Sequence, residues 1–320
     1  MSAAAGSTGA GSTAAENGAT GSTGAGNTTA GSAGAGITRV GVVGCGTMGA
    51  GIAELCAKAG LDVRVAVSSA GSAEAGRRRI AQSLGRAVTR GKLTAEARER
   101  ALAAISFTDA LPDLADRQLV IESITEDEKL KRHVFTALDA ALTDPGAILA
   151  SNTSSLRIAT LAECTERPER VVGMHFFNPA QVLPLVEVVP AERTAGRVVA
   201  VTESFAADVL GKQVIRSADR CGFVVNALLI PFVLAAVRMV EVGHASRADI
   251  DRGMKLGCSH PLGPLELADL IGLDTVASVA EAMHAEFGEP LYAPPPLLRE
   301  LVTAGRLGRK TGSGFFDYPR

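Results

Sequence analysis

Residues 37–60 read ITRVGVVGCGTMGAGIAELCAKAG, and this stretch decides the fold. The apolar, β-branched residues of 37–43 predict a short strand, and residues 50–59 predict a helix that ends at a glycine. Residues 44–49 join the two elements with the pattern G-x-G-x-x-G. The pattern is informative because a strand precedes it and a helix follows it, which is the arrangement of a dinucleotide-binding domain.

The three glycines of this loop each have a physical task. Gly44 permits the tight turn, Gly46 lets the backbone approach a pyrophosphate, and Gly49 lets the helix pack closely on the strand. The free N–H groups at the start of the helix then face the phosphate charge. We therefore expect this loop, including Thr47 and Met48, to bind a dinucleotide; the alternative is a packing turn that binds nothing.

A second strand is expected at 62–67, and the residues at its end bear on which dinucleotide binds. An acidic residue usually stands there and holds the 2′-hydroxyl of the adenosine ribose, but this chain has Val67 followed by Ser68 and Ser69. Arg64 and the arginines at 77–79 are near in sequence, and arginine suits a phosphate by charge and forked geometry. Our hypothesis is that NADP is preferred, with Ser68 as a contact. The alternative is that 77–79 form a solvated helix face and NAD binds without its usual anchor.

Composition excludes several classes of protein. With 320 residues, 47% of them hydrophobic, the chain is long enough for about two domains, and a net charge of −2 gives no reason to expect nucleic acid or an anionic membrane as partner. Polar residues interrupt the apolar stretch 222–242, so it is a poor candidate for a membrane span. Five scattered cysteines without CxxC spacing argue against disulfides and a metal site, and favour a reducing cytoplasm.

Residues 1–36 differ from the rest of the chain. Gly, Ala, Ser and Thr dominate, and Gly-Ser-Thr recurs at 6–8, 11–13 and 21–23. Such a segment has too few large apolar groups to offset the entropy of ordering, so we expect a disordered tail. It has no charged start and no apolar run, and it is not rich in arginine, so neither a secretory signal nor a mitochondrial presequence is expected.

The strand and helix alternation continues to about residue 220 and then stops. Further strands are expected at 118–124, 147–150, 170–177 and 185–189, with a charged helix at 129–142. Beyond residue 221 apolar residues recur at helical spacing in 223–242, 247–257, 264–270, 273–287 and 297–304. We therefore predict an α/β protein with a Rossmann-type doubly wound sheet in 37–220 and an all-α domain in 221–320.

Two of the expected strands carry His175 and Glu187. Oxidation of an alcohol by hydride transfer requires removal of the hydroxyl proton, which a histidine accepts near neutral pH. A buried carboxylate would fix the tautomer of the ring and stabilise the imidazolium. On spacing alone the pair is weak evidence, since a histidine is more often a packed or surface residue. The polar run 151–155 also follows a strand, at the edge where doubly wound sheets bind ligands.

Several longer motifs resemble the L-3-hydroxyacyl-CoA dehydrogenase family, and most of all its bacterial 3-hydroxybutyryl-CoA dehydrogenases. The resemblance extends from about residue 38 to 318. It rests on ASNTSSL at 150–156, GMHFFNP at 173–179, LVEV at 185–188, GFVVN at 222–226, MKLG at 254–257, HPLGPLE at 260–266 and GRKTGSGF at 308–315. The resemblance implies an oxidoreductase of fatty acid metabolism and β-oxidation that interconverts a 3-hydroxyacyl-CoA and its 3-oxo form with NAD(P).

The resemblance also implies roles for residues at the reacting end of the substrate. It makes His175 the general acid and base, and Glu187 the group that orients it. Ser154 would donate a hydrogen bond to the 3-oxygen of the substrate, and Asn226 would help to position the thioester. From the sequence alone, Ser154 or Asn152 is also a plausible N-cap for a helix from residue 156, and Asn226 a satisfied buried amide.

Other positions are implied on the cofactor and coenzyme A sides. Glu126, Lys131, Asn178 and Lys310 match positions that line the nicotinamide and its ribose, and the ribose aspartate of the family falls on Val67. Two arginines, Arg86 and Arg90, match lysines that hold the phosphates of coenzyme A, although arginines four residues apart are also typical of a solvated helix face. The helical domain would form a homodimer, with the helix at 223–240 as its surface.

Three alternatives to this function stay open. A dehydrogenase of the same fold that acts on a hydroxyacyl carrier protein (ACP) in polyketide extender-unit synthesis would share the His175 and Glu187 pair. A sugar-acid dehydrogenase of the same superfamily would not need Arg86 and Arg90. A non-catalytic, crystallin-like protein that binds a dinucleotide would have no use for the four residues expected around the substrate.

Overall fold

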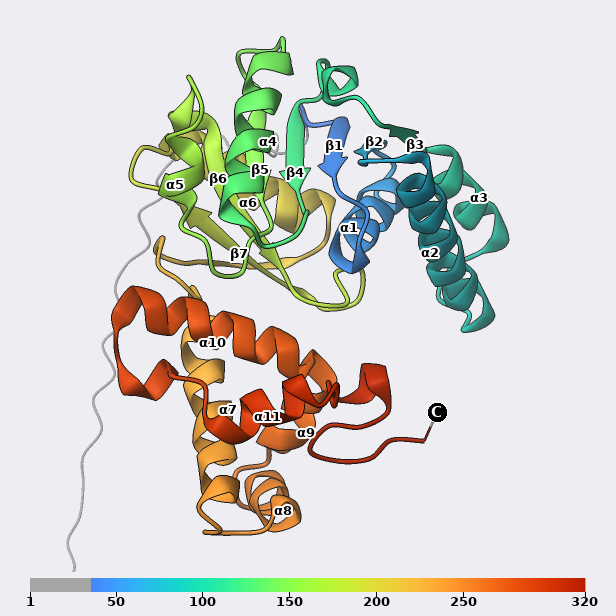
Figure 1. The fold of residues 1–320 in the computed structure, drawn as a ribbon. Helices are drawn as coiled ribbons and strands as arrows, with labels where there is room; N and C mark the ends of the chain where they lie inside the picture. Colours follow the sequence, from blue (N-terminus) through green and yellow to red (C-terminus); the bar gives the residue numbers. More distant parts are fainter. Residues whose placement is uncertain (1–35, 320) are drawn as a thin grey trace, which may run out of the picture. The chain divides into compact units, whose positions relative to one another are not determined.

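The computed structural model describes residues 36–319. The tail expected at 1–36 therefore lies outside the described residues, apart from Gly36. An eight-stranded sheet of order β3-β2-β1-β4-β5-β6-β7-β8 forms the N-terminal part (Figure 1). Its strands are β1 (Arg39–Val43), β2 (Asp62–Ala66), β3 (Ile105–Thr108), β4 (Leu119–Glu122), β5 (Ile148–Ser151), β6 (Val171–Phe176), β7 (Leu185–Pro190) and β8 (Gln213–Arg216).

The first six strands of this order are parallel, which places the carboxyl ends of β1, β4, β5 and β6 at one edge of the sheet. β7 runs antiparallel to β6, and β8 runs parallel to β7. The buried Val, Ile and Leu residues of the central strands explain why they pair inside the sheet, since strands covered on both faces are apolar along their whole length.

Helices cover both faces of the sheet. The residues of one buried cluster come from α1 (Thr47–Lys58), α2 (Ala70–Thr89), α3 (Ala95–Ala103) and α6 (Gly196–Ser204). The opposite face is covered by α4 (Glu128–Ala141) and α5 (Ile158–Ala162), which belong to a second cluster. This is the doubly wound arrangement predicted from the sequence. The edge strands β3 and β8 and the helices α3 and α6 had not been predicted, and α2 had been considered only as a solvated helix face that carries the arginines.

The C-terminal part is helical, as predicted, and has a buried core of its own. Its helices are α7 (Val225–Glu241), α8 (Arg247–Gly257), α9 (Pro264–Ile271), α10 (Leu273–Phe287) and α11 (Pro296–Thr303). In the described part of the chain, no helix combines the length and the apolar character that crossing a membrane requires.

The end of the chain folds back onto this helical part. The buried carboxylate of Asp269, on α9, accepts hydrogen bonds from the backbone N–H groups of Phe315 and Phe316, each at 2.9 Å, and from the hydroxyl of Tyr318 at 3.0 Å. Burial, followed by the hydrogen bond to Asp269, raises the pKa of Tyr318 to about 12. Segment 315–318 is thereby fixed to α9.

Candidate active site

His175 and Glu187 face each other across the antiparallel pair β6 and β7. The Nδ1 atom of His175 lies 2.6 Å from Oε2 of Glu187, and both side chains are buried. A carboxylate accepts hydrogen bonds and donates none, so this contact keeps a proton on Nδ1 and leaves Nε2 as the atom that exchanges a proton with a ligand. The structure thus brings together the pair predicted from the sequence.

The second oxygen of Glu187 is bonded to the start of α7. Its Oε1 atom accepts hydrogen bonds from the N–H groups of Val224 at 3.1 Å and Val225 at 2.9 Å. This carboxylate has no exposed surface, and these contacts satisfy the charge that burial would otherwise leave unpaired. Asn226 is the next residue of the same helical turn, so the first turn of α7 is joined to the His175 and Glu187 pair.

Two aromatic rings flank the ring of His175. The ring centroid of Phe177 is 4.5 Å away and that of Phe223 is 5.6 Å away, and both rings are tilted relative to the imidazole. Phe223 is held at a φ of 48°, a left-handed conformation that side chains rarely adopt, directly before α7. These ring contacts restrict the orientation of the imidazole.

The polar run 151–155 gathers around Glu126. The Oε1 atom of Glu126 accepts hydrogen bonds from the N–H groups of Ser154 and Ser155, at 2.9 and 3.1 Å, and from the hydroxyls of Thr153 and Ser155. Burial alone would raise the pKa of Glu126, but the ammonium of Lys131 and these hydrogen bonds outweigh it and hold the pKa below its ordinary value. Ser154 and Glu126, predicted separately, therefore lie side by side.

The ammonium of Lys131 lies between two carboxylates. It is 2.7 Å from Oε1 of Glu122 and 3.2 Å from Oε2 of Glu126, and the side chain is 1% exposed. Glu122 also accepts hydrogen bonds from the hydroxyl of Ser151 and the N–H of Ile124, both at 2.7 Å. Glu122 had not been predicted as a site residue from the sequence. The signal was present in its position, because a glutamate closes the otherwise apolar strand Leu-Val-Ile-Glu.

The helix-cap alternative for Asn152 and Ser154 was wrong. The side-chain oxygen of Asn152 accepts the N–H of Phe176 at 2.8 Å, and its amide donates to the hydroxyl of Ser123. This side chain therefore links the ends of β4 and β6. The N–H groups at the start of α5 are bonded instead to the carboxylate of Asp219, at 2.6 and 2.8 Å.

The glycine loop has the shape that a pyrophosphate requires. Gly44 has a φ of 92°, and a Cβ atom at Gly49 would meet the carbonyl oxygen of Gly44 at 2.1 Å. A Cβ atom at Gly46 would meet nothing within 4 Å, so there is open space beside this residue. Helix α1 begins at Thr47 without a side-chain cap or an acidic residue in its first turn. The N–H groups of this turn, which includes Met48, fit an anionic ligand.

The arginines near the adenosine end of the loop all have partners within the chain. Arg77 lies over the ring of Phe107 at 4.4 Å, Arg78 pairs with Glu74, and Arg79 donates to the carbonyl of Cys45. The hydroxyl of Ser69 caps α2 by accepting the N–H of Ser72, and Ser68 is exposed beside it. Arg64 is bonded to the carbonyl of Asp113. None of these contacts directs a guanidinium group toward Ser68.

Four predicted site residues have no described contact with His175, Glu187, Glu126 or Lys131. Lys310 forms an ion pair with Asp274 in the helical domain, with both carboxylate oxygens at 2.6 Å. Asn178 is exposed in the turn after β6. Arg86 and Arg90 are exposed at the end of α2, and neither forms an ion pair with a residue of the described chain.

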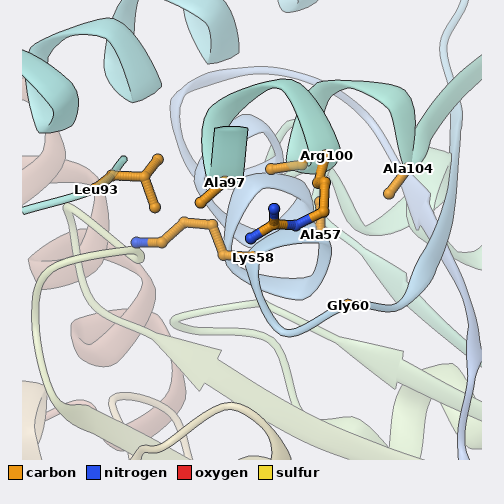
Figure 2. A pocket seen from close by; sticks show the side chains of 8 residues that line it. Ala57, Lys58, Gly60, Leu93, Ala97, Arg100 and Ala104 are labelled. Carbon is orange, nitrogen blue, oxygen red and sulfur yellow. The ribbon is translucent and has the colours of Figure 1, made fainter. Parts of the chain in front are cut away.

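A separate hollow of about 320 Å³ lies at the end of α1. Figure 2 shows Lys58 and Arg100 beside it, together with Leu93 and Ala97. None of the residues predicted for the active site lines it. The candidate site therefore lies elsewhere, at the carboxyl edge of β1, β4, β5 and β6.

Two models of one protein family match this chain. The model described as "3-hydroxyacyl-CoA dehydrogenase, NAD binding domain" matches residues 39–220, and the model of the C-terminal domain of the same family matches residues 222–318. The chain belongs to the 3-hydroxyacyl-CoA dehydrogenase family. It therefore has the NAD-binding and C-terminal parts of a dehydrogenase of this family, in agreement with the resemblance drawn from the motifs.

Individual proteins are also similar to this chain in sequence and in structure. The chain is 55% identical over 267 residues to a 3-hydroxybutyryl-CoA dehydrogenase of Mycobacterium tuberculosis, covering 83% of this chain and 93% of that protein, and 45% identical to one of Bradyrhizobium diazoefficiens, covering 83% and 90%. Among solved structures, M. tuberculosis FadB2 matches with a TM-score of 0.87 at 55% identity, over 88% of this chain and 99% of FadB2. The (S)-3-hydroxybutyryl-CoA dehydrogenase PaaH1 of Ralstonia eutropha matches with a TM-score of 0.83 at 44% identity, over 89% and 100%.

Proposed function

We propose that this protein interconverts an (S)-3-hydroxyacyl-CoA and the corresponding 3-oxoacyl-CoA, with 3-hydroxybutyryl-CoA and acetoacetyl-CoA as its substrates. The observation that carries the proposal is the buried contact of 2.6 Å between His175 and Glu187, at the same sheet edge as the glycine loop. The names of the relatives support the short acyl chain. A place in fatty acid metabolism and a cytoplasmic location, consistent with five free cysteines, belong to the same proposal.

The proton chemistry is assigned to His175. A bound nicotinamide dinucleotide would supply or accept the hydride at carbon 3 of the substrate. In the direction of reduction, protonated His175 gives the proton on Nε2 to the oxygen at carbon 3, while Glu187 stabilises the imidazolium beforehand. In the direction of oxidation the same nitrogen accepts the hydroxyl proton. Ser154 donates a hydrogen bond to that oxygen, and Asn226 positions the thioester from the first turn of α7.

The cofactor is assigned to the glycine loop and the residues around Glu126 and Lys131. Asn178 belongs to the same assignment as a residue of the turn after β6. Lys310 is the least supported member, because its ammonium is already paired with Asp274. We also propose that NADP is preferred to NAD, since no carboxylate follows β2 to repel a 2′-phosphate. Ser68, exposed at this position, supports this preference.

Coenzyme A is assigned to the exposed end of α2. Arg86 lies in its last turn and Arg90 is the residue that follows the helix, and neither forms a salt bridge with a carboxylate of the described chain. Guanidinium groups suit phosphates because their N–H donors match phosphate oxygens in pairs. A phosphate site at Arg86 and Arg90 would favour acyl-CoA over substrates that carry no phosphate.

A homodimer and the boundaries of the two domains complete the proposal. The domains are taken to be 37–220 and 221–320. Three large apolar side chains of the helical domain are more than two thirds exposed, namely Leu228, Val242 and Leu256. Exposed apolar groups of this size are typical of a subunit interface, and a second copy of the chain is the partner we propose.

The experiment that tests the function is a matrix of initial rates. Acetoacetyl-CoA, longer 3-oxoacyl-CoA thioesters and acetoacetyl-ACP are each assayed with NADPH and with NADH. Fast reduction of acetoacetyl-CoA is expected, with the higher kcat/KM for NADPH. A preference for the ACP thioester would favour the carrier-protein alternative, and turnover of none of these substrates would overturn the proposal.

A further inference from the structure

Glu122, Ser151 and His175 point to the same face of the sheet. They are the last or nearly last residues of β4, β5 and β6, three neighbouring parallel strands. Side chains alternate between faces along a strand, and the residues directly before them, Ile121, Ala150 and Met174, all belong to the cluster on the α1 face. Glu122 itself reaches Lys131 on α4, which covers the opposite face.

The glycine loop lies directly beside this row of polar residues. Val43, the last residue of β1, pairs with Glu122 in the sheet. A Cβ atom at Gly44 would meet the carbonyl oxygen of Ser123 at 2.6 Å, so the loop packs against the residue that follows Glu122. Glu122 therefore lies between the loop assigned to the pyrophosphate and His175, which is assigned to proton transfer.

The polar group around Lys131 carries an excess of negative charge. Two carboxylates, those of Glu122 and Glu126, share a single ammonium, that of Lys131. Glu122 receives hydrogen bonds from three donors, which are Lys131, the hydroxyl of Ser151 and the N–H of Ile124. The three side chains therefore sum to one negative charge.

We propose that Glu122 makes the cofactor site discriminate between oxidised and reduced nicotinamide. The oxidised ring carries a positive charge and the reduced ring is neutral, so a fixed negative charge at this edge stabilises the oxidised form selectively. Glu122 has no exposed surface, and water and salt screen such a charge poorly. The inference rests on the proposed function, because it requires the nicotinamide to bind at this edge.

The test measures dissociation constants for NADP⁺ and NADPH, and for NAD⁺ and NADH, by calorimetry. Glu122→Gln keeps the shape of the side chain and removes its charge. We expect it to weaken binding of the oxidised forms by about tenfold, the scale of one partly screened charge, and that of the reduced forms by less than about twofold. Glu54→Gln is the matched control, because it removes another buried carboxylate, on α1. We expect it to leave the ratio of oxidised to reduced affinity unchanged for both dinucleotides.

A double variant separates the effect of charge from an effect of structure. Glu122→Gln combined with Lys131→Gln removes one negative and one positive charge, so the net charge of the group is restored. The ratio of oxidised to reduced affinity is then expected to return toward that of the wild type, whatever happens to the absolute affinities. If Glu122→Gln does not fold, Glu126→Gln removes the same charge at the partly exposed end of the group and provides the same comparison.

The possible outcomes distinguish this inference from the proposed function. If the wild type binds neither form of either dinucleotide, the cofactor assignment itself fails. If it binds both forms and Glu122→Gln weakens them equally, the cofactor assignment stands and the charge inference is overturned. If the double variant keeps the altered ratio of the single variant, the role of Glu122 is structural and the inference is again overturned.

Discussion

Replacement of Glu187 by glutamine tests whether the carboxylate acts by its charge. The amide oxygen of the variant can still accept the N–H groups of Val224 and Val225, so the start of α7 keeps its partners. What is lost is the charge-assisted contact of 2.6 Å with His175. Such a hydrogen bond contributes about 1.5–3 kcal/mol, which corresponds to a fall in kcat of about 10- to 150-fold if the contact stabilises the imidazolium.

The assay is steady-state reduction of acetoacetyl-CoA, with the melting temperature and the Kd for NADPH measured on the same preparations. His175→Gln sets the lower limit, because loss of general acid–base catalysis costs about 10²–10⁴-fold. Glu163→Gln, an exposed carboxylate at the end of α5, is the control and should retain full activity. A folded Glu187→Gln variant with kcat within threefold of the wild type would refute the reasoning.

A second replacement at the same position separates activity from stability. Glu187→Leu removes the acceptor of the N–H groups of Val224 and Val225, which lie in a partly buried environment. Each unsatisfied group costs about 1–3 kcal/mol, and each kcal/mol lowers the melting temperature by roughly 2–4 °C in a chain of this size. The leucine variant should therefore melt well below the glutamine variant, while both lose activity.

Other predictions follow from burial, charge and exposure. Burial raises the pKa of Glu54, so its charged form opposes folding as pH rises above the unfolded pKa; Glu54→Gln should raise the melting temperature at pH 7 and change it little at pH 4. Arg86→Gln with Arg90→Gln should raise the KM for acetoacetyl-CoA about tenfold and reduce its dependence on salt. Leu228→Glu places a charge on the exposed apolar surface of the helical domain and should convert the proposed dimer to monomers in sedimentation velocity. Val67→Asp should shift kcat/KM from NADPH toward NADH in initial-rate assays.

The fold was predictable because its evidence is local and periodic. The glycine loop, the apolar strands and the helical spacing beyond residue 221 each require only a short window of sequence. The strands β3 and β8 escaped prediction because they form the two edges of the sheet. Their residues are only partly buried, so the continuous apolar run of a central strand is missing.

Parts of the candidate site depend on contacts that sequence spacing does not reveal. Glu122 meets Lys131 nine residues away only because α4 folds back over the sheet. Asn152 was expected to cap a helix, but the acceptor for α5 is Asp219, 61 residues from Ile158. The three arginines at 77–79 looked like a single patch, yet consecutive residues on a helix point in different directions, and each has a different partner.

The hydrogen bonds that join segment 315–318 to Asp269 have a practical consequence for truncating or tagging this protein. Proteolysis or a stop codon before Phe315 would remove the three donors that the described residues offer to this buried carboxylate, so loss of the segment 315–318 should destabilise the helical domain. An affinity tag is better placed after Tyr318 than in place of residues 315–318. Gly314 tolerates no larger residue, because an added methyl group would fall 1.9 Å from an oxygen of the same aspartate.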